Sequence, residues 1–412
     1  MKRYGNLYSK IYDFENLYEA YLEARKGKRY RPDVLEFTAN LEENLIQIQN
    51  ELIWKMYRVG RYREFYVYEP KKRLIMALPF KDRVVQWAVY RVLFPIFDKG
   101  FYEHSYACRM GKGTHAAADQ LQHWLKLLDR KSKKYYYLKM DISKYFYRVD
   151  HEVAINIFEK KIKDKDVIWL LKEIIQSDHV PFGLPLGVEP GDCPRHLRLY
   201  DKGMPIGNLT SQLLANIYLN ELDQFCKHEL RIRYYIRYMD DFIILHHNKK
   251  HLHWIKKEVE NFLNNELKLH LNRKTCIRPI NLGTEFVGFK IWPTHRRLKK
   301  KTALKIKKRL KYLKKAYARG EVDFDSVNAT VQSYLGVLKH CNSYYLKQSI
   351  FNDFVLTREH DNLEVRDGRY KKHWCTKDQL KRLVQLEALT AEEYKTITGE
   401  DYGDGEDYGD QN

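Results

Sequence analysis

The sequence lacks the features of a zinc-knuckle, exported or membrane-spanning protein. Its six cysteines include no Cys-x-x-Cys pair, which argues against a zinc site and, in a chain without an export signal, favours reduced thiols. No stretch approaches the roughly 20 uninterrupted apolar residues that a membrane helix needs. The first residues, MKRYGNLYSKIYDF, have neither the apolar core nor the small-residue cleavage site of a signal peptide. We therefore expect a cytoplasmic protein that contacts no membrane.

Basic residues are absent from the end of the chain, where no Lys or Arg follows Lys395. A last helix is expected over 377–395, and the repeated acidic stretch GEDYGDGEDYGD after it is typical of a disordered tail. The whole chain carries a formal charge of +20, and setting the six acids of the tail aside raises it to +26. A body this basic most often contacts a polyanion, with nucleic acid as the first candidate. A solvated surface that only keeps the protein soluble is the alternative.

Local patterns predict the elements of two or three packed units, which 412 residues can form. Apolar residues at helical spacing predict helices in residues 1–60. Residues 61–80 alternate like a strand pair that turns at Glu69–Pro70, and a helix then runs to Gly100. Residues 178–204 hold four prolines and four glycines, which predicts a long irregular or hairpin segment of the kind that is usually functional.

Two adjacent carboxylates, Asp240 and Asp241, lie between two apolar runs in YYIRYMDDFIILHH, residues 234–247. The runs have the β-branched and aromatic composition of strands, so the chain must turn at Met239–Asp240. A third carboxylate, Asp141, ends a strand predicted in KYYYLKMDISKYF. Taken alone, a Tyr-x-Asp-Asp pattern is also compatible with an ordinary acidic hairpin tip.

If these strands are neighbours, three carboxylates gather at one edge of a sheet. Ionised groups beside a hydrophobic sheet cost several kcal/mol unless a positive charge neutralises them. Mg²⁺ prefers such oxygens together with substrate phosphates, and two ions can clamp the attacking and leaving oxygens of a phosphoryl displacement. The pattern therefore predicts two Mg²⁺ ions, with Mn²⁺ able to substitute, and a nucleotide substrate.

Seven blocks of the sequence resemble, in order and spacing, the motifs of reverse transcriptases. The palm motifs are matched by YLKMDISKYF, GMPIGNLTSQLLANIYLNELD, YIRYMDDFIIL, LHLNRKT and FVGFK, and the fingers motifs by RLIMALPFKDRVVQWAV and FYEHSYACRMGKGTHAA. The resemblance covers about residues 50–350. It implies an α/β (α+β) fold of the right-hand polymerase type, with fingers, a ferredoxin-like palm and a helical thumb.

The resemblance also implies a layout of domains along the chain. The ranges are 1–60 for an N-terminal helical extension, 61–133 for the fingers, 134–291 for the palm with its insertion 178–204, 292–355 for the thumb, and 356–412 for a C-terminal helix and disordered acidic tail.

The resemblance implies a catalytic site residue by residue. Asp141 and Asp240 would be the paired metal ligands, assisted by the main chain of Ile142. Asp241 would be a weaker third carboxylate. Lys274 matches a lysine that approaches the leaving pyrophosphate, where a cation stabilises developing charge.

Further positions would bind the nucleotide and the template. Phe146 falls where the family keeps an aromatic steric gate against a ribose 2′-OH, so the product should be DNA; the alternative is an ordinary core aromatic. Arg73 and Lys81 would hold the triphosphate, and Arg109 and Lys112 would meet the template backbone. A charged surface is the alternative explanation for each of these four. The remaining family positions are Gly207, Ser211 and Gln212 beside the nucleotide and Gly288 beside the template and primer.

A cationic helix is predicted where the thumb would lie, because residues 296–315 hold twelve Lys or Arg in twenty positions. An apolar stripe on it consists of Ile306, Leu310, Leu313 and Tyr317. This helix would lie along the template–primer duplex with its stripe packed on the palm. Its cations, among them Lys305, Lys308 and Arg309, would contact phosphates without sequence preference. A solvated cationic helix is the alternative.

One departure from the family pattern concerns the block GMPIGNLTSQLLANIYLNELD, the fourth in chain order. Most reverse transcriptases carry glutamine where this chain has Ile206, and proline where it has Gln212. The aliphatic residue, with Ser-Gln following, is similar to the enzymes of diversity-generating retroelements. An aliphatic side chain cannot hydrogen-bond the sugar beside the nascent base pair, so looser control of pairing geometry would permit misincorporation. In that family, cDNA copied with errors at template adenines overwrites part of a protein gene.

The expected function is therefore RNA-directed DNA synthesis by a bacterial or phage enzyme of that type. Its partners would be an RNA template, the DNA product and RNA–DNA hybrid, dNTPs, and a small basic accessory protein. No block resembles an RNase H, HNH endonuclease or integrase domain. An antiphage-defence or group II intron-like reverse transcriptase is one alternative. A non-catalytic RNA-binding module that keeps the fold is another.

Overall fold

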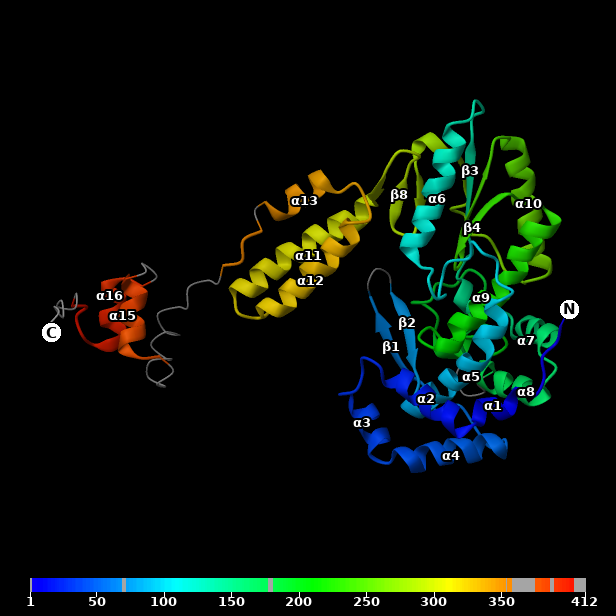
Figure 1. The fold of residues 1–412 in the computed structure, drawn as a ribbon, viewed down its shortest axis with the longest axis horizontal. Coiled ribbons are helices and arrows are strands. Elements are labelled where there is room, and N and C mark those ends of the chain that lie inside the picture. The colour runs from blue at the N-terminus through cyan, green and yellow to red at the C-terminus, as the bar shows by residue number, and fades with distance from the viewer. Residues whose placement is uncertain are drawn as a thin grey trace, which may run out of the picture. The chain divides into compact units, whose positions relative to one another are not determined.

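The computed structural model describes residues 2–68, 72–176, 181–352, 354–357, 375–385 and 389–403 (Figure 1). The chain divides into two compact units, Met1–Arg297 and Leu298–Asn412. Among the described residues, no helix combines the length and the apolar character that crossing a membrane requires.

Four helices open the first unit, and they bury the apolar residues that were predicted at helical spacing. Leu17, Leu45 and Ile48 are almost completely buried. The Asp13 side chain caps the second helix by accepting hydrogen bonds from two backbone N–H groups. The helices are α1 Tyr8–Tyr12, α2 Phe14–Arg25, α3 Pro32–Ala39 and α4 Leu41–Ile53, and α2 packs on α5, Phe80–Asp98.

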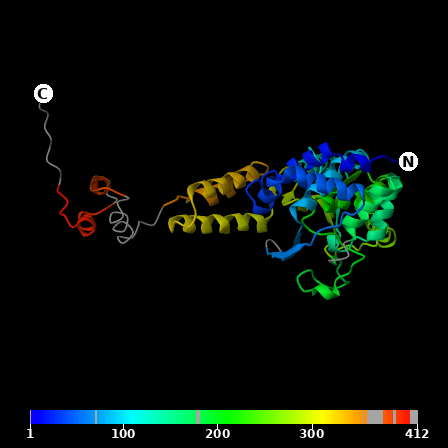
Figure 2. The same cartoon turned by 90° about the horizontal axis from the view of Figure 1, so that it is seen from below.

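The predicted strand pair is an antiparallel hairpin of β1, Arg63–Val67, and β2, Arg73–Ala77. Its expected turn at Glu69–Pro70 lies outside the described residues. Residues 181–203 are irregular, as predicted, except for a short 3-10 helix at Arg195–Leu197. Figure 2 shows this segment projecting on the same side of the unit as the hairpin.

Two polar contacts join that segment to the hairpin. Arg198 forms an ion pair with Glu64 at 3.1 Å, and the Lys72 ammonium donates to the Gly191 carbonyl at 3.0 Å. The hairpin and the insertion therefore support each other, although about 120 residues separate them in the sequence.

A four-stranded antiparallel sheet forms the centre of the first unit. Its strands are β3 Tyr136–Asp141, β4 Tyr234–Tyr238, β5 Asp241–His246 and β6 Cys276–Pro279, in the spatial order β4-β5-β3-β6. Helix α9, Leu209–Gln224, precedes β4, and helix α10, Lys249–Asn265, lies between β5 and β6. A β-α-β-β-α-β chain with this strand order is ferredoxin-like, which confirms the predicted fold class of the palm.

Burial explains why the sheet holds this register. Leu138, Met140 and Ile244 are completely buried, and a slip of one residue would turn each of them to the opposite face. Helix α10 contacts β3, β5 and β6, whereas α6, Thr114–Asp129, contacts β4. Asn208 is the N-cap residue of α9, but its side-chain amide donates to the Tyr62 hydroxyl at 2.8 Å and makes no cap bond.

The rest of the first unit consists of helices and a small sheet. Helices α7, His151–Lys161, and α8, Lys165–Ile175, contact each other after β3. The small sheet has the order β7-β8-β9, with strands Thr284–Phe286, Phe289–Ile291 and Arg296–Leu298.

The second unit contains the predicted cationic helix as α11, Lys300–Ala318, followed by α12, Phe324–Leu338, and α13, Tyr344–Phe351. Ile306, Leu310 and Leu313 of the predicted stripe are buried, and α11 contacts α12.

The single helix expected over 377–395 is wrong, because the chain forms α15, Lys377–Gln385, and then α16, Ala391–Thr398. Thr390 restarts the helix through a capping box with Glu393, which satisfies free N–H groups at the new N-terminus. The acidic tail from residue 404 lies outside the described residues.

Candidate active site

Three carboxylates meet at one edge of the central sheet. Asp141, at the end of β3, is the cross-strand partner of Asp241 at the start of β5. The backbone N–H of Ile142 donates to the carbonyl oxygen of Asp240 at 3.2 Å. The structure therefore brings together the four residues that were predicted to form the metal site.

The turn that carries Asp240 is held by a buried ion pair. Met239 has a φ of 56°, a left-handed conformation that is uncommon for a residue with a side chain. The Arg237 guanidinium donates to the Met239 carbonyl at 3.1 Å. The same guanidinium makes two bonds to the Asp223 carboxylate, at 2.7 and 2.6 Å, and both side chains are fully buried. Arg237 thus connects the core of the sheet to the turn that presents Asp240.

Burial and charge repulsion mark Asp240 as the carboxylate that most needs a cation. Burial, followed by the charges of Asp141 and Asp241, raises the pKa of Asp240 to about 6, while Arg73 opposes the rise. A carboxyl group with a raised pKa gains from a bound divalent cation, because the cation replaces the proton and offsets the repulsion. Oxygen donors from clustered carboxylates fit a hard cation such as Mg²⁺.

The other two carboxylates have polar partners inside the protein. The Asn272 amide donates to Asp141 Oδ2 at 3.1 Å, and its backbone N–H donates to the Asp141 carbonyl at 2.7 Å. Lys139 forms an ion pair with Asp241 Oδ2 at 2.8 Å. In the described residues no group of three His, Cys, Asp or Glu side chains is arranged to hold a metal ion. Because the Lys139 ammonium already offsets the charge of Asp241, Asp141 and Asp240 are the better candidate metal ligands.

The raised pKa of Asp240 predicts a pH dependence of stability. The folded protein holds this proton more tightly than the unfolded chain, so the free energy of unfolding should fall as pH rises from about 4 to about 6. At about 1.4 kcal/mol per pH unit, the loss is at most about 3 kcal/mol. Urea unfolding of wild type and Asp240→Asn at several pH values measures it, because asparagine cannot ionise.

We expect Asp240→Asn to gain stability relative to wild type over that pH range, and added Mg²⁺ to reduce the difference at pH 7.5. Parallel pH profiles of the two proteins would contradict the assignment of the raised pKa to Asp240.

Lys274 lies in the turn that supports Asp141. Its backbone N–H donates to the Asn272 side-chain oxygen at 3.1 Å, and the residue is exposed. Asn272 therefore ties both Asp141 and the Lys274 backbone to one turn. Asn272 was not among the predicted site residues, because its contact is with Asp141, 131 residues away in the sequence.

Backbone hydrogen bonds hold the segment Met204–Ile206 between Phe146 on one side and strand β2 on the other. Phe146 is half-buried in a 3-10 turn, and its carbonyl accepts from the Met204 N–H at 2.6 Å. The Ile206 carbonyl accepts from the Met76 N–H of β2 at 3.1 Å. Gly207 has a φ of 126°, and a Cβ there would lie 3.1 Å from the Met76 carbonyl oxygen, so a side chain would be strained.

Two cations beside Phe146 were not predicted. The Lys144 ammonium pairs with Glu189 of the insertion at 2.9 Å. Arg148 is buried, and its Nε has no hydrogen-bond partner among the described residues. Both lie within two residues of Phe146 in the sequence, and the charge of Arg73 acts on Tyr147 in the same turn.

Three of the four predicted fingers cations have partners inside the protein. Lys81 pairs with Glu51 at 2.5 Å. Arg109 pairs with Asp98 at 2.6 Å and donates to two backbone carbonyls, so it stabilises its own loop. Lys112 donates to a backbone carbonyl at 3.0 Å and lies over the Tyr106 ring. Arg73 is the one whose charge acts on Asp240.

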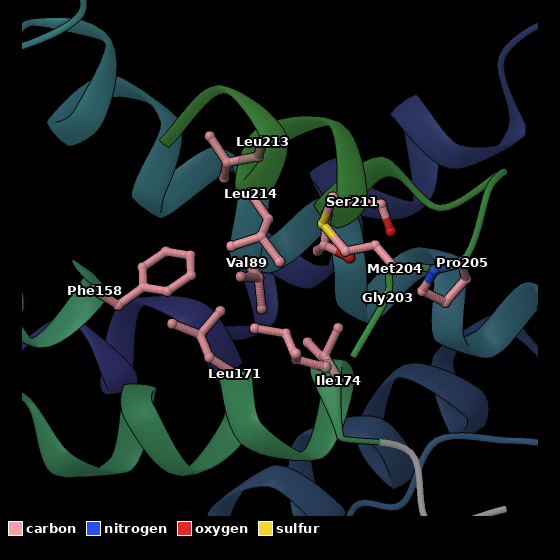
Figure 3. Close-up of a pocket in the computed structure, with 12 residues that line it drawn as sticks. Val89, Phe158, Leu171, Ile174, Gly203, Met204, Pro205, Ser211, Leu213 and Leu214 are labelled. Atoms are coloured by element: carbon pink, nitrogen blue, oxygen red, sulfur yellow. The ribbon is translucent and has the colours of Figure 1, made fainter. Parts of the chain in front are cut away.

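A small apolar cavity lies behind the segment that carries Ile206. Figure 3 shows Gly203, Met204 and Ser211 on one side of it and Leu171 of α8 opposite. Its volume is about 20 Å³, far below the roughly 300 Å³ of a small ligand pocket. The cavity is therefore a packing defect behind the predicted nucleotide positions, of which Ser211 is buried and Gln212 exposed.

The predicted template and primer residues are found on a turn and on α11. Gly288, with a φ of 90°, follows Val287 in the two-residue turn between β7 and β8, where two positive φ values suit a tight hairpin. Lys305, Lys308 and Arg309 are exposed on α11 in the second unit.

Comparison with known proteins identifies two segments. The family model described as "Reverse transcriptase (RNA-dependent DNA polymerase)" matches residues 69–313, which is more than half of the chain. A second family model, described as "Phage uncharacterised protein (Phage_XkdX)", matches residues 368–402.

Curated relatives and a solved structure also match. Protein YkfC of Escherichia coli (strain K12) is 28% identical over 61% of this chain and 72% of its own length. The group II intron-encoded protein LtrA of Lactococcus lactis subsp. cremoris is 25% identical over 68% of this chain, which spans 54% of that protein. A structure of apo telomerase from Candida tropicalis has 15% identity and a TM-score of 0.41, covering 61% of this chain and 59% of that one.

Proposed function

The chain belongs to the reverse transcriptase family of RNA-dependent DNA polymerases, and we propose that it extends a primer on an RNA template by nucleotidyl transfer at Asp141 and Asp240. The observation that supports this most strongly is the cross-strand pairing of β3 and β5, which brings Asp141 to the Asp240–Asp241 turn. Divalent ions held by these two carboxylates would neutralise charge on the attacking and leaving oxygens.

The protein's own residues would orient the reactants. Asn272 fixes the Asp141 carboxylate through its amide, and Arg237 holds the turn of Asp240. Arg73 would attract the triphosphate, and Lys274 would stabilise charge on the departing pyrophosphate. Phe146 would exclude a 2′-OH by volume and so favour deoxynucleotides.

The test is primer extension with the full chain, a primed RNA and the four dNTPs. We expect Mg²⁺-dependent product that survives RNase and is degraded by DNase, with ribonucleotides incorporated poorly. Omission of the RNA template and addition of EDTA are the controls. Absence of extension with either Mg²⁺ or Mn²⁺, in protein shown to be folded, would refute the activity.

We further propose that the enzyme is of the diversity-generating retroelement type and is error-prone at template adenines. The support is Ile206, whose backbone is fixed by Met76 of β2 and which cannot offer a side-chain hydrogen bond to a sugar. We also propose that the protein works in the cytoplasm with a small basic accessory protein, and that its gene is bacterial or phage-encoded.

Ile206→Gln should lower the error rate opposite adenine. An amide at this position can hydrogen-bond the incoming sugar and restrain the geometry of the base pair; one hydrogen bond of about 1 kcal/mol corresponds to about a fivefold change. Sequencing of cDNA copied from one RNA by the two proteins measures the error spectrum. Ile206→Leu is the matched control, and an unchanged spectrum in Ile206→Gln would count against this type.

A group II intron-like enzyme is the second candidate, because LtrA is named a group II intron-encoded protein. The DNA around the gene would separate the two. A near-duplicate pair of short repeats, one of them inside a coding frame, supports diversification, whereas flanking intron RNA sequence supports the intron reading.

A further inference from the structure

The end of the central sheet that is remote from the carboxylates carries a basic cavity. Strands β3 and β4 begin there and β5 ends there, so the six residues of β5 place it about 17 Å from the active site. The cavity has a volume of about 240 Å³. Six of its lining residues are basic and none of those described is acidic: Lys131, Arg231, Arg233, His246, His247 and His251.

The cations of this cavity are available to an anionic ligand. Lys131, Arg231 and Arg233 are exposed, and none of them forms an ion pair with a carboxylate in the part of the chain that the structure describes. Partial desolvation and the charge of the neighbouring His246 lower the pKa of His247 and His251, which favours the neutral form of both imidazoles. Lysine and arginine therefore supply the charge, and the imidazoles supply hydrogen-bonding groups.

Aromatic rings accompany these cations. The Lys131 ammonium lies 6.0 Å from the centre of the Tyr135 ring, and the Arg233 guanidinium lies 5.4 Å from that of Tyr234. The His251 ring stacks on Trp254 at 5.2 Å, and Trp254 is 46% exposed. Tyr135 is buried and Tyr234 is half-buried, so Trp254 supplies the exposed ring. Cations that contact phosphates near an exposed aromatic ring that stacks on a base are the combination by which proteins hold single-stranded nucleic acid.

We propose that this surface, the palm-end surface formed by the six basic residues and Trp254, binds a single-stranded segment of RNA outside the active site. This inference rests on the proposed function in one respect, the choice of RNA as the polyanion that the protein meets. The surface would hold an RNA strand while another part of the same molecule is copied. An acidic protein would satisfy the cations but leave Trp254 without a base to stack on, so RNA accounts for more of the surface.

The test compares two variants with equal loss of charge. Lys131→Gln/Arg231→Asn/Arg233→Gln removes three cations from the palm-end surface, with asparagine at position 231 because φ is 50° there. The control, Lys163→Gln/Lys165→Gln/Lys172→Gln, removes three exposed cations at and before α8. Fluorescence anisotropy at several salt concentrations gives the Kd of each full-length protein for a labelled single-stranded RNA of about 30 nucleotides.

The palm-end variant should raise the Kd about 10-fold or more and reduce the salt slope by about 2–3, whereas the control changes the Kd less than about twofold. Trp254→Ala should weaken binding about fivefold or more without changing the salt slope. Extension of a short primed template, which cannot span both sites, should be unchanged in all three.

Equal RNA affinity of the palm-end variant and the control would overturn the proposal. Loss of binding to poly-glutamate with unchanged RNA affinity would also overturn it, in favour of an acidic protein partner. Circular dichroism melting curves confirm that each variant is folded. RNA binding does not require catalysis, so the two proposals can fail separately. If the wild-type protein makes no cDNA and only the palm-end variant loses RNA affinity, the proposed activity is refuted and the RNA-binding surface is supported.

Discussion

Asp240→Asn is expected to abolish cDNA synthesis while leaving the fold intact. Asparagine keeps the shape of the side chain but removes its ionisable carboxyl group. Burial and the charges of Asp141 and Asp241 raise the pKa of that carboxyl group in the wild-type protein. Loss of a group that stabilises transition-state charge typically costs about 10²–10³-fold, and loss of a metal ligand should cost at least that much. Primer extension under single-turnover conditions measures the rate.

Asp241→Asn is the matched comparison, because the two aspartates are adjacent but differ in their surroundings. Lys139 already pairs with Asp241 at 2.8 Å, so this variant should lose less activity than Asp240→Asn. Both variants should melt cooperatively. Activity of Asp240→Asn within about twofold of wild type would remove Asp240 from the chemistry.

Arg237→Met is expected to destabilise the protein by about 3–5 kcal/mol. The substitution leaves the Asp223 carboxylate fully buried without its cation, and breaking one side of a buried ion pair has a cost of that order. Met239 also loses the guanidinium that donates to its carbonyl in the left-handed turn. Urea unfolding measures the change in the free energy of unfolding.

A double variant separates stability from positioning. Arg237→Met/Asp223→Leu removes both charges and should recover most of the lost stability. It should not recover kcat, because the turn that carries Asp240 still lacks the bond from position 237. Arg237→Lys retains one charge and should restore part of kcat at similar KM. If the double variant regains full kcat, Arg237 serves only the stability of the fold.

The sequence determined those features that depend on residues close together in the chain. Apolar runs rich in β-branched and aromatic residues predicted the strands beside Asp141 and Asp240. The resemblance carried by the order of blocks implied a ferredoxin-like palm, which the strand order confirms. The stripe of Ile306, Leu310 and Leu313 predicted α11, because the helical period alone places these residues on one face. The prediction of one helix over 377–395 was wrong, because Thr390 and Glu393 form a capping box that starts a second helix.

Only the tertiary structure decided which charges meet. Asn272 reaches Asp141, Lys139 reaches Asp241 and Arg109 turns to Asp98, and none of these pairings follows from a periodic pattern. Periodicity reports which face of an element is buried, whereas the partner of a charged side chain depends on which distant element packs beside it. The partners of these charged side chains were therefore set by packing between segments far apart in the chain.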